Sequence, residues 1–150
     1  MYRTILVPTD GSEGAETATR EALALAERFD ATLHALYVVD TASVPRTIDA
    51  RNVDRALEEA ATDATGTVSE AAEGRGIEVV TDVVHGAVHR SIVDYAEEQD
   101  VDLIVMGTHG RQGLERYLIG SVTEKVVRTA TVPVLTVHRS REAPDSATGG

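Results

Sequence analysis

The chain has 150 residues, enough for one domain with a substantial core, and 42% of them are apolar. Its formal net charge of −11 argues against a partner of nucleic acid, because binding a phosphate backbone needs a basic face. No apolar run approaches the roughly 18 residues of a transmembrane helix, and the absence of cysteine excludes disulfides and thiolate metal sites. We therefore expect no membrane partner.

The start of the chain and its charged residues bear on where the protein works. Residues 1–13, MYRTILVPTDGSE, read as a strand entering a turn and lack the features of a signal peptide, so we expect a cytoplasmic protein. There are 25 acidic residues against 14 basic ones, and Lys125 is the single lysine. Such a surface is typical of halophilic proteins, in which salt screens the self-repulsion. An ordinary acidic protein from a GC-rich genome is the alternative.

The predicted elements alternate between strands and helices along the chain. Continuous Val, Ile and Leu runs predict strands at 3–9, 31–40, 76–86, 101–107 and 132–139. Apolar residues at helical spacing predict helices at 10–29, 51–74, 87–100 and 119–129, the second interrupted by Gly66. The first helix is capped either by Asp10 with Glu13 or by Ser12. Residues 41–50 read as a loop, and 140–150 as a disordered polar tail after one domain, 1–139.

This order predicts an α/β fold with an open, doubly wound, five-stranded parallel sheet and helices on both faces. Ligands of such sheets bind beyond the carboxyl ends of the strands, where the strand order reverses. If the first strand is central and the fourth lies beside it, two loops line the site. One is PTDGSE at 8–13, and the other is GTHGRQGLERYLIGSVT at 107–123.

The second loop has the ingredients of a phosphate site. Gly107 ends a strand, where a Cβ would crowd anything lying over the strand end, and Gly110 and Gly113 allow positive φ or a close approach of the backbone. Gly120 and Ser121 then open a helix, whose free N–H groups favour an anion. Arg111 adds a cation, and Ser121 and Thr123 add hydroxyls. The alternative is a ligand-free loop in which the glycines end a strand and Ser121 with Glu124 forms a capping box. A P-loop and a G-x-G-x-x-G fingerprint are both missing from the sequence.

The spacing of these glycines resembles the universal stress protein family. ATP-binding members carry G-x2-G-x9-G-[ST], which corresponds here to Gly107, Gly110, Gly120 and Ser121. The start, ILVPTDGSEGAETATREALALA, is also similar to the family, so the likeness covers most of residues 2–138. One departure is that Ala87 and Val88 stand where many members have a proline.

The resemblance implies strand order 3-2-1-4-5, a homodimer, and ATP or another adenine nucleotide between the first and fourth strands. Pro8, Thr9 and Asp10 would border the adenosine, and Val38 or Val39 would pack on the base. Met106, Gly107 and Gly110 would line the ribose and phosphates. The phosphates would be held by Gly120, Ser121, Val122 and Thr123, with Arg111 as an addition from the residues themselves. Mg²⁺ or Mn²⁺ would be held mainly by the phosphates.

Catalytic residues are not evident. Asp10 could hold a ribose hydroxyl or a metal, or simply cap a helix, and His109 could carry a proton or be solvated. His85 and His89 have i,i+4 spacing, but a strand-to-helix break at Gly86 argues against a metal site. The resemblance implies at most slow hydrolysis or autophosphorylation.

Three functions stay open at this point. They are an ATP-binding regulatory stress-response homodimer, a slow ATPase or phosphotransfer enzyme, and a ligand-free dimerisation module. The family's dimer forms through the fifth strand, here Val132–His138, which would otherwise be an exposed edge. The alternative is an edge blunted by Pro133 and a monomeric protein.

Overall fold

The computed structural model describes residues 2–41, 50–108 and 120–138, with the side chains of 50–54 excepted. Gly110, Arg111, His109, Gly113 and the predicted tail at 140–150 therefore lie outside the described residues. In the part that is described, no helix is long and apolar enough to cross a membrane.

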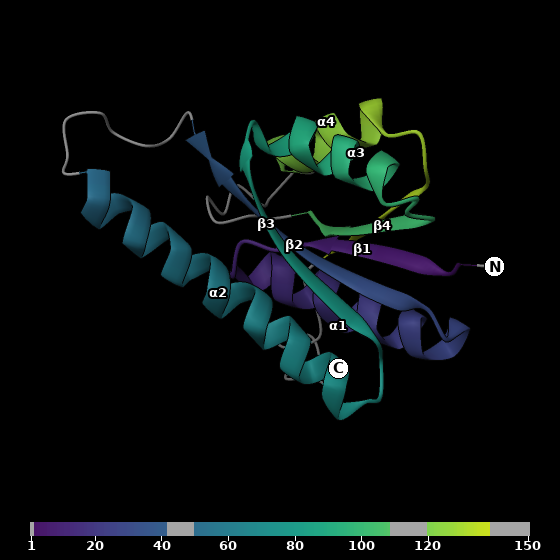
Figure 1. The fold of residues 1–150 in the computed structure, drawn as a ribbon. Coiled ribbons are helices and arrows are strands. Elements are labelled where there is room, and N and C mark those ends of the chain that lie inside the picture. Colours follow the sequence, from purple (N-terminus) through teal and green to yellow (C-terminus); the bar gives the residue numbers. More distant parts are fainter. Residues whose placement is uncertain (1, 42–49, 109–119, 139–150) are drawn as a thin grey trace, which may run out of the picture.

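All nine predicted elements are present, in the predicted order (Figure 1). They are β1 (Thr4–Pro8), α1 (Glu13–Phe29), β2 (Thr32–Asp40), α2 (Ala50–Gly74), β3 (Val79–Gly86), α3 (Val88–Glu98), β4 (Leu103–Gly107), α4 (Ser121–Thr129) and β5 (Val134–Val137). The predicted interruption at Gly66 is wrong, because α2 continues through it. A single glycine costs a helix only about 1 kcal/mol, which packing of the helix against the sheet offsets.

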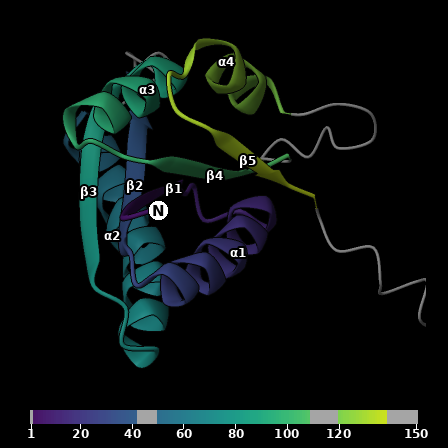
Figure 2. The same cartoon turned by 90° about the vertical axis from the view of Figure 1, so that its right-hand side faces the viewer.

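The strands form one parallel sheet with the order β3-β2-β1-β4-β5, which confirms the predicted fold class. β1 pairs with β2 on one side and with β4 on the other, so the strand order reverses between β1 and β4. β3 and β5 are the two edges (Figure 2). The loops after β1 and β4 therefore leave the sheet from adjacent strands, at the position where ligands of doubly wound sheets bind.

Two helices cover each face of the sheet. Figure 1 shows α1 and α2 on the lower side and α3 and α4 on the upper side. Alternate residues of the central strands divide between the two cores. Ile5, Val7, Leu33 and Val105 pack toward α1 and α2. Leu6, Leu36, Ile104 and Met106 pack toward α3 and α4.

The helix α1 approaches the sheet closely because its buried face consists mostly of small residues. Ala15, Ala18, Ala22 and Ala26 recur at helical spacing and are all buried. Its start is also well defined, because Ser12 is the N-cap and its hydroxyl accepts a hydrogen bond of 3.2 Å from the Ala15 N–H. This packing fixes the α1 N-terminus next to the ends of β1 and β4.

Candidate functional site

The turn after β1 is held in one conformation by short hydrogen bonds. The Thr9 N–H donates to the Leu36 carbonyl at 2.8 Å, which extends the pairing of β1 and β2 by one residue. The Asp10 carboxylate accepts from the Ser12 N–H at 2.9 Å, and the Thr9 hydroxyl accepts from the Gly11 N–H at 3.2 Å. Gly11 has a φ of +80°, a conformation that suits glycine.

These bonds decide between the two caps that the sequence allowed for α1. Ser12 is the cap, and Asp10 binds the backbone of the turn that precedes the helix. The Asp10 side chain is partly exposed at the carboxyl end of β1. Asp10 therefore stands at the carboxyl ends of β1 and β4, where a ligand of the site could contact its side chain.

Gly107 is explained by the packing of α1. A Cβ at Gly107 would lie 2.4 Å from the carbonyl oxygen of Gly14 and 2.8 Å from its carbonyl carbon. Both atoms are backbone, so no side chain can rotate away. A side chain at Gly107 would therefore collide with the first turn of α1, a packing reason for glycine that holds without any ligand.

The start of α4 differs from the predicted capping box. Gly120 is the N-cap and Ser121 is already the first helical residue, so the box of Ser121 and Glu124 is wrong. The Glu124 carboxylate instead accepts from Arg128 at 2.9 Å, one turn further along the exposed face. Within the described residues, no side chain caps the first turn of α4. Its amide groups are thus left for solvent or for an anion.

Two hydrogen bonds attach this helix start to the end of β4. The Gly120 N–H donates to the Thr108 carbonyl at 2.7 Å, so the residues on either side of 109–119 are joined directly. The buried Thr123 hydroxyl donates to the Gly107 carbonyl at 2.8 Å. The only hydroxyl hydrogen of Thr123 is therefore used within the protein, whereas the Ser121 side chain is exposed.

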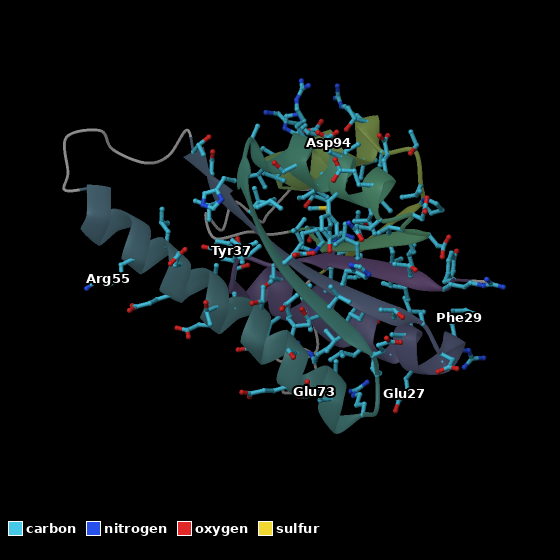
Figure 3. All side chains as sticks on the ribbon, in the orientation of Figure 1. Glu27, Phe29, Tyr37, Arg55, Glu73 and Asp94 are labelled. Atoms are coloured by element: carbon cyan, nitrogen blue, oxygen red, sulfur yellow. The ribbon has the colours of Figure 1, made fainter. Side chains whose placement is uncertain are left out.

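The two valines at the end of β2 point to opposite faces of the sheet. Val39 is buried on the α2 side, where it packs with Tyr37 and Ala61. Figure 3 shows Tyr37 between β2 and α2. Val38 is partly exposed and belongs to the apolar cluster on the α3 and α4 side, together with Met106 and Val122. Of the two candidates, Val38 shares the face that carries the start of α4.

The two histidines with i,i+4 spacing lie on either side of the junction between β3 and α3. His85 is the penultimate residue of β3 and His89 lies in the first turn of α3. Gly86 between them has a φ of +152°, which separates strand from helix as expected. Nowhere among the described residues do three or more His, Asp or Glu side chains group in a way that could hold a metal ion.

Comparison with known proteins gives this arrangement a family. The model of the universal stress protein family matches residues 1–138. The chain belongs to the universal stress protein family. Universal stress protein MJ0531 of Methanocaldococcus jannaschii is 38% identical over 145 residues, which cover 95% of this chain and 85% of that protein.

Solved structures of universal stress proteins share the fold. The structure of MJ0577, also from M. jannaschii, matches with a TM-score of 0.84 at 34% identity and covers 94% of this chain and 99% of that one. The universal stress protein UspA from Lactobacillus plantarum matches with a TM-score of 0.79 at 31% identity, over 91% of this chain and 97% of its own. A universal stress protein in complex with cAMP matches with a TM-score of 0.69 at 26% identity, over 93% and 98% of the two chains.

Sequence reasoning missed several residues that shape this part of the universal stress protein fold. Gly14 provides the backbone that Gly107 accommodates, and buried Thr108 joins Gly120 and β5, since its N–H donates to the Val137 carbonyl at 3.1 Å. The glycine-rich start of α1 was a signal for the first. A hydrogen-bonded network of the buried His34 and Tyr95 with the partly exposed Asp82 was also missed. Its signal was a histidine inside the apolar run of β2.

Proposed function

We propose that this universal stress protein binds ATP at the carboxyl ends of β1 and β4 and acts as a nucleotide-responsive regulatory homodimer in a stress response. The observation that carries the proposal is the start of α4. Its first turn has no side-chain cap among the described residues, it is tied by Gly120 and Thr123 to the end of β4, and its sequence completes the G-x2-G-x9-G-S pattern.

The phosphates are proposed to lie against the first turn of α4. Four backbone N–H groups at a helix start have no partner within the helix, and they favour an anion. Here the Gly120 N–H donates to Thr108 and the Glu124 N–H to Gly120, which leaves the N–H groups of Ser121, Val122 and Thr123 for the phosphates. Ser121 offers an exposed hydroxyl. Thr123 contributes through its backbone and by anchoring the helix, because its hydroxyl already donates to Gly107. Gly110 and Arg111 complete this proposed contact set.

The adenosine is proposed to lie between the turn after β1 and the end of β2. Pro8, Thr9 and Asp10 would border it, with the Asp10 carboxylate near the ribose. Val38 would pack on the base, since it shares a face of the sheet with Met106 and Val122. Support for an adenine ligand comes from the related universal stress protein that was solved in complex with cAMP.

A divalent cation, Mg²⁺ or Mn²⁺, is proposed to accompany the nucleotide. The formal net charge of the chain is −11, and Asp10 and Glu13 stand close to the start of α1. A triphosphate would add negative charge in this acidic environment, so neutralisation by a cation lowers the electrostatic cost of binding. Because the described residues form no metal-binding cluster of their own, the phosphates would supply most of the ligands.

The homodimer is proposed to form through β5 and its flanks, Val132–His138. β5 is a sheet edge, and a large apolar side chain there, Leu135, is 36% exposed. On the adjacent α4, Val127 is 44% exposed. Unpaired strand edges with apolar residues favour association. Light scattering after size exclusion would report a dimer that Leu135→Arg converts to a monomer. Val83→Arg, at a 41% exposed valine on the opposite edge strand, is the matched control.

The function is tested by identifying the nucleotide that co-purifies with the protein. We expect an adenine nucleotide in near-stoichiometric amount, which is lost in Gly110→Val and in Gly120→Val while circular dichroism stays unchanged. If the folded protein carries no nucleotide and binds none when ATP and Mg²⁺ are added, the proposal is wrong. The ligand-free dimerisation module would then be the remaining function. Turnover well above about 1 s⁻¹, in the usual range of enzymes, would favour the ATPase instead.

A further inference from the structure

A hydrogen-bond network of His34, Tyr95 and Asp82 connects β2, α3 and β3, away from the proposed nucleotide site. The His34 Nδ1 lies 2.8 Å from the Tyr95 hydroxyl, and that hydroxyl donates to the Asp82 Oδ2 at 2.7 Å. The two rings meet edge to face with centroids 5.7 Å apart. His34 is only 8% exposed and Tyr95 only 5%. This network joins α3 to both β2 and β3 beside the apolar cluster that also holds Ile92 and Ala96.

The direction of these bonds determines the protonation of the imidazole. The Tyr95 hydrogen goes to Asp82, so the Tyr95 oxygen must accept from the Nδ1–H of His34. A neutral His34 then carries its lone pair on Nε2. Burial lowers the pKa of His34, an effect that the Asp82 charge partly opposes. Burial and the hydrogen bond to Asp82 raise the pKa of Tyr95, so the phenol stays protonated.

Few charges act on His34 from the elements that surround it. From β3 the charge of Asp82 acts on it, and its partner in register there is the apolar Val80. Glu78, just before β3, accepts from Thr32 at 3.4 Å. From β1 its partner in register is the apolar Leu6. From α3 it meets Tyr95, and Glu98 and Asp94 lie with Tyr95 around a shallow pocket that Val84 and Ser91 complete. Asp94 is seen on the outer side of α3 in Figure 3.

We infer that the His34–Tyr95–Asp82 network is an acid-sensitive latch. It holds α3 on the sheet while His34 is neutral and releases α3 when His34 is protonated. A second proton on Nε2 places a positive charge in a site that is almost closed to water. Asp82 compensates it only through the intervening hydroxyl of Tyr95. Opening α3 hydrates the imidazolium and removes that cost.

The pH range follows from the sign of the change. The pKa of His34 is lowered in the closed state, whereas the open state has the ordinary value of 6.5. Above this value both states are neutral and the latch has its full strength. Below it the open state gains protons first, so the latch weakens as the pH falls. A pH of 5.5 lies one unit below the open-state pKa. Protonation of His34 can therefore raise the open fraction by at most about tenfold at this pH.

Release of α3 would reach the nucleotide site through α4. Ile92 of α3 and Val126 of α4 are fully buried in the same apolar cluster, and Thr123 of α4 holds the Gly107 carbonyl. A loosened α3 therefore weakens the support of the first turn of α4. This second step rests on the proposed function, and we expect lower ATP affinity at acidic pH from it.

The latch itself is tested without nucleotide, by hydrogen exchange of the α3 amides at pH 7.5 and 5.5 after correction for intrinsic rates. We expect protection of α3 to fall by up to about tenfold at pH 5.5 while α1 is unaffected. His34→Asn keeps a donor at the Nδ1 position but cannot be protonated, and it should abolish the change. Asp82→Asn removes the charge that favours the imidazolium in the closed state, so the fall in protection at pH 5.5 should be at least as large as in the wild type. His85→Gln, at an exposed histidine of β3, is the control and should behave as wild type.

The outcomes separate the latch from the proposed function. Equal protection of α3 at both pH values in the wild type, an unchanged response in His34→Asn, or a smaller response in Asp82→Asn would overturn the latch. ATP with Mg²⁺ is then titrated at the same two pH values. A loss of affinity at pH 5.5 that is larger in the wild type than in His34→Asn supports transmission to the site, and an equal loss overturns it. A pH-dependent α3 in a protein that never binds ATP keeps the latch and removes the proposed function.

Discussion

Replacing Gly107 with alanine tests whether this glycine serves packing or only a ligand. The added Cβ would lie 2.4 Å from the Gly14 carbonyl oxygen. Contacts below 3.0 Å essentially never occur for a real Cβ, so β4 or the first turn of α1 must move. Overpacking of a well-packed interior costs about 1–3 kcal/mol. We take about 2 kcal/mol, because both opposing atoms belong to the backbone.

That free energy corresponds to a readily measured change. For a chain of this size, 1 kcal/mol shifts the melting temperature by roughly 2–4 °C, so Gly107→Ala should lower it by about 4–8 °C. Gly66→Ala is the matched control. A Cβ at Gly66 meets nothing within 4 Å, and alanine in the interior of α2 should stabilise the protein by up to about 1 kcal/mol. The two alanine substitutions are thus expected to change the melting temperature in opposite directions.

The assay is thermal unfolding followed by circular dichroism, without nucleotide and at one salt concentration. If Gly107→Ala melted within about 1 °C of the wild type, a shift below about 0.5 kcal/mol, the packing explanation would be refuted. A variant of normal stability that had lost ATP binding would instead support a role of Gly107 in direct contact with the ligand.

Four further predictions concern the α1 cap, the hydrogen bond of Thr123, the dependence of stability on salt and the divalent cation. Ser12→Ala removes the α1 cap and should cost about 1 kcal/mol, seen in calorimetry as a melting temperature lower by roughly 2–4 °C. Thr123→Val leaves the Gly107 carbonyl without its hydroxyl partner and should cost about 1–3 kcal/mol in urea unfolding, whereas Thr129→Val on the exposed face should stay within about 0.5 kcal/mol. If the acidic surface is a halophilic adaptation, the melting temperature should rise from dilute buffer to molar KCl, and a value independent of salt would remove that interpretation. Chelation of divalent ions with EDTA should weaken ATP binding, and an unchanged affinity would exclude the proposed cation.

Much of the fold was predictable because its signals are local and repeat along the chain. Val, Ile and Leu runs such as 101–107 predict buried parallel strands, and Ala15, Ala18 and Ala22 predict a helix that packs on them. The strand order followed from the family resemblance. The glycine-rich segment 107–120 begins at the end of β4, beside β1, where the strand order reverses, so the predicted topology is the part of the site's setting that the structure bears out.

What could not be predicted depends on contacts between distant residues. The packing of Gly107 against Gly14 joins segments more than ninety residues apart, and no local pattern indicates it. The capping box at Ser121 failed because the hydrogen bond from Gly120 to Thr108 begins the helix at Ser121 itself. Likewise, the alternation of a strand cannot say which of Val38 and Val39 faces α4, since that depends on which helices cover each face.

The central claim is that the carboxyl ends of β1 and β4 bind an adenine nucleotide. Isothermal titration with ATP in molar KCl and Mg²⁺ tests it most directly. We predict saturable binding of one nucleotide per chain, which Gly120→Val abolishes and Gly66→Ala leaves intact. A folded wild-type protein that gives no saturable heat with ATP, AMP or cAMP would contradict the claim.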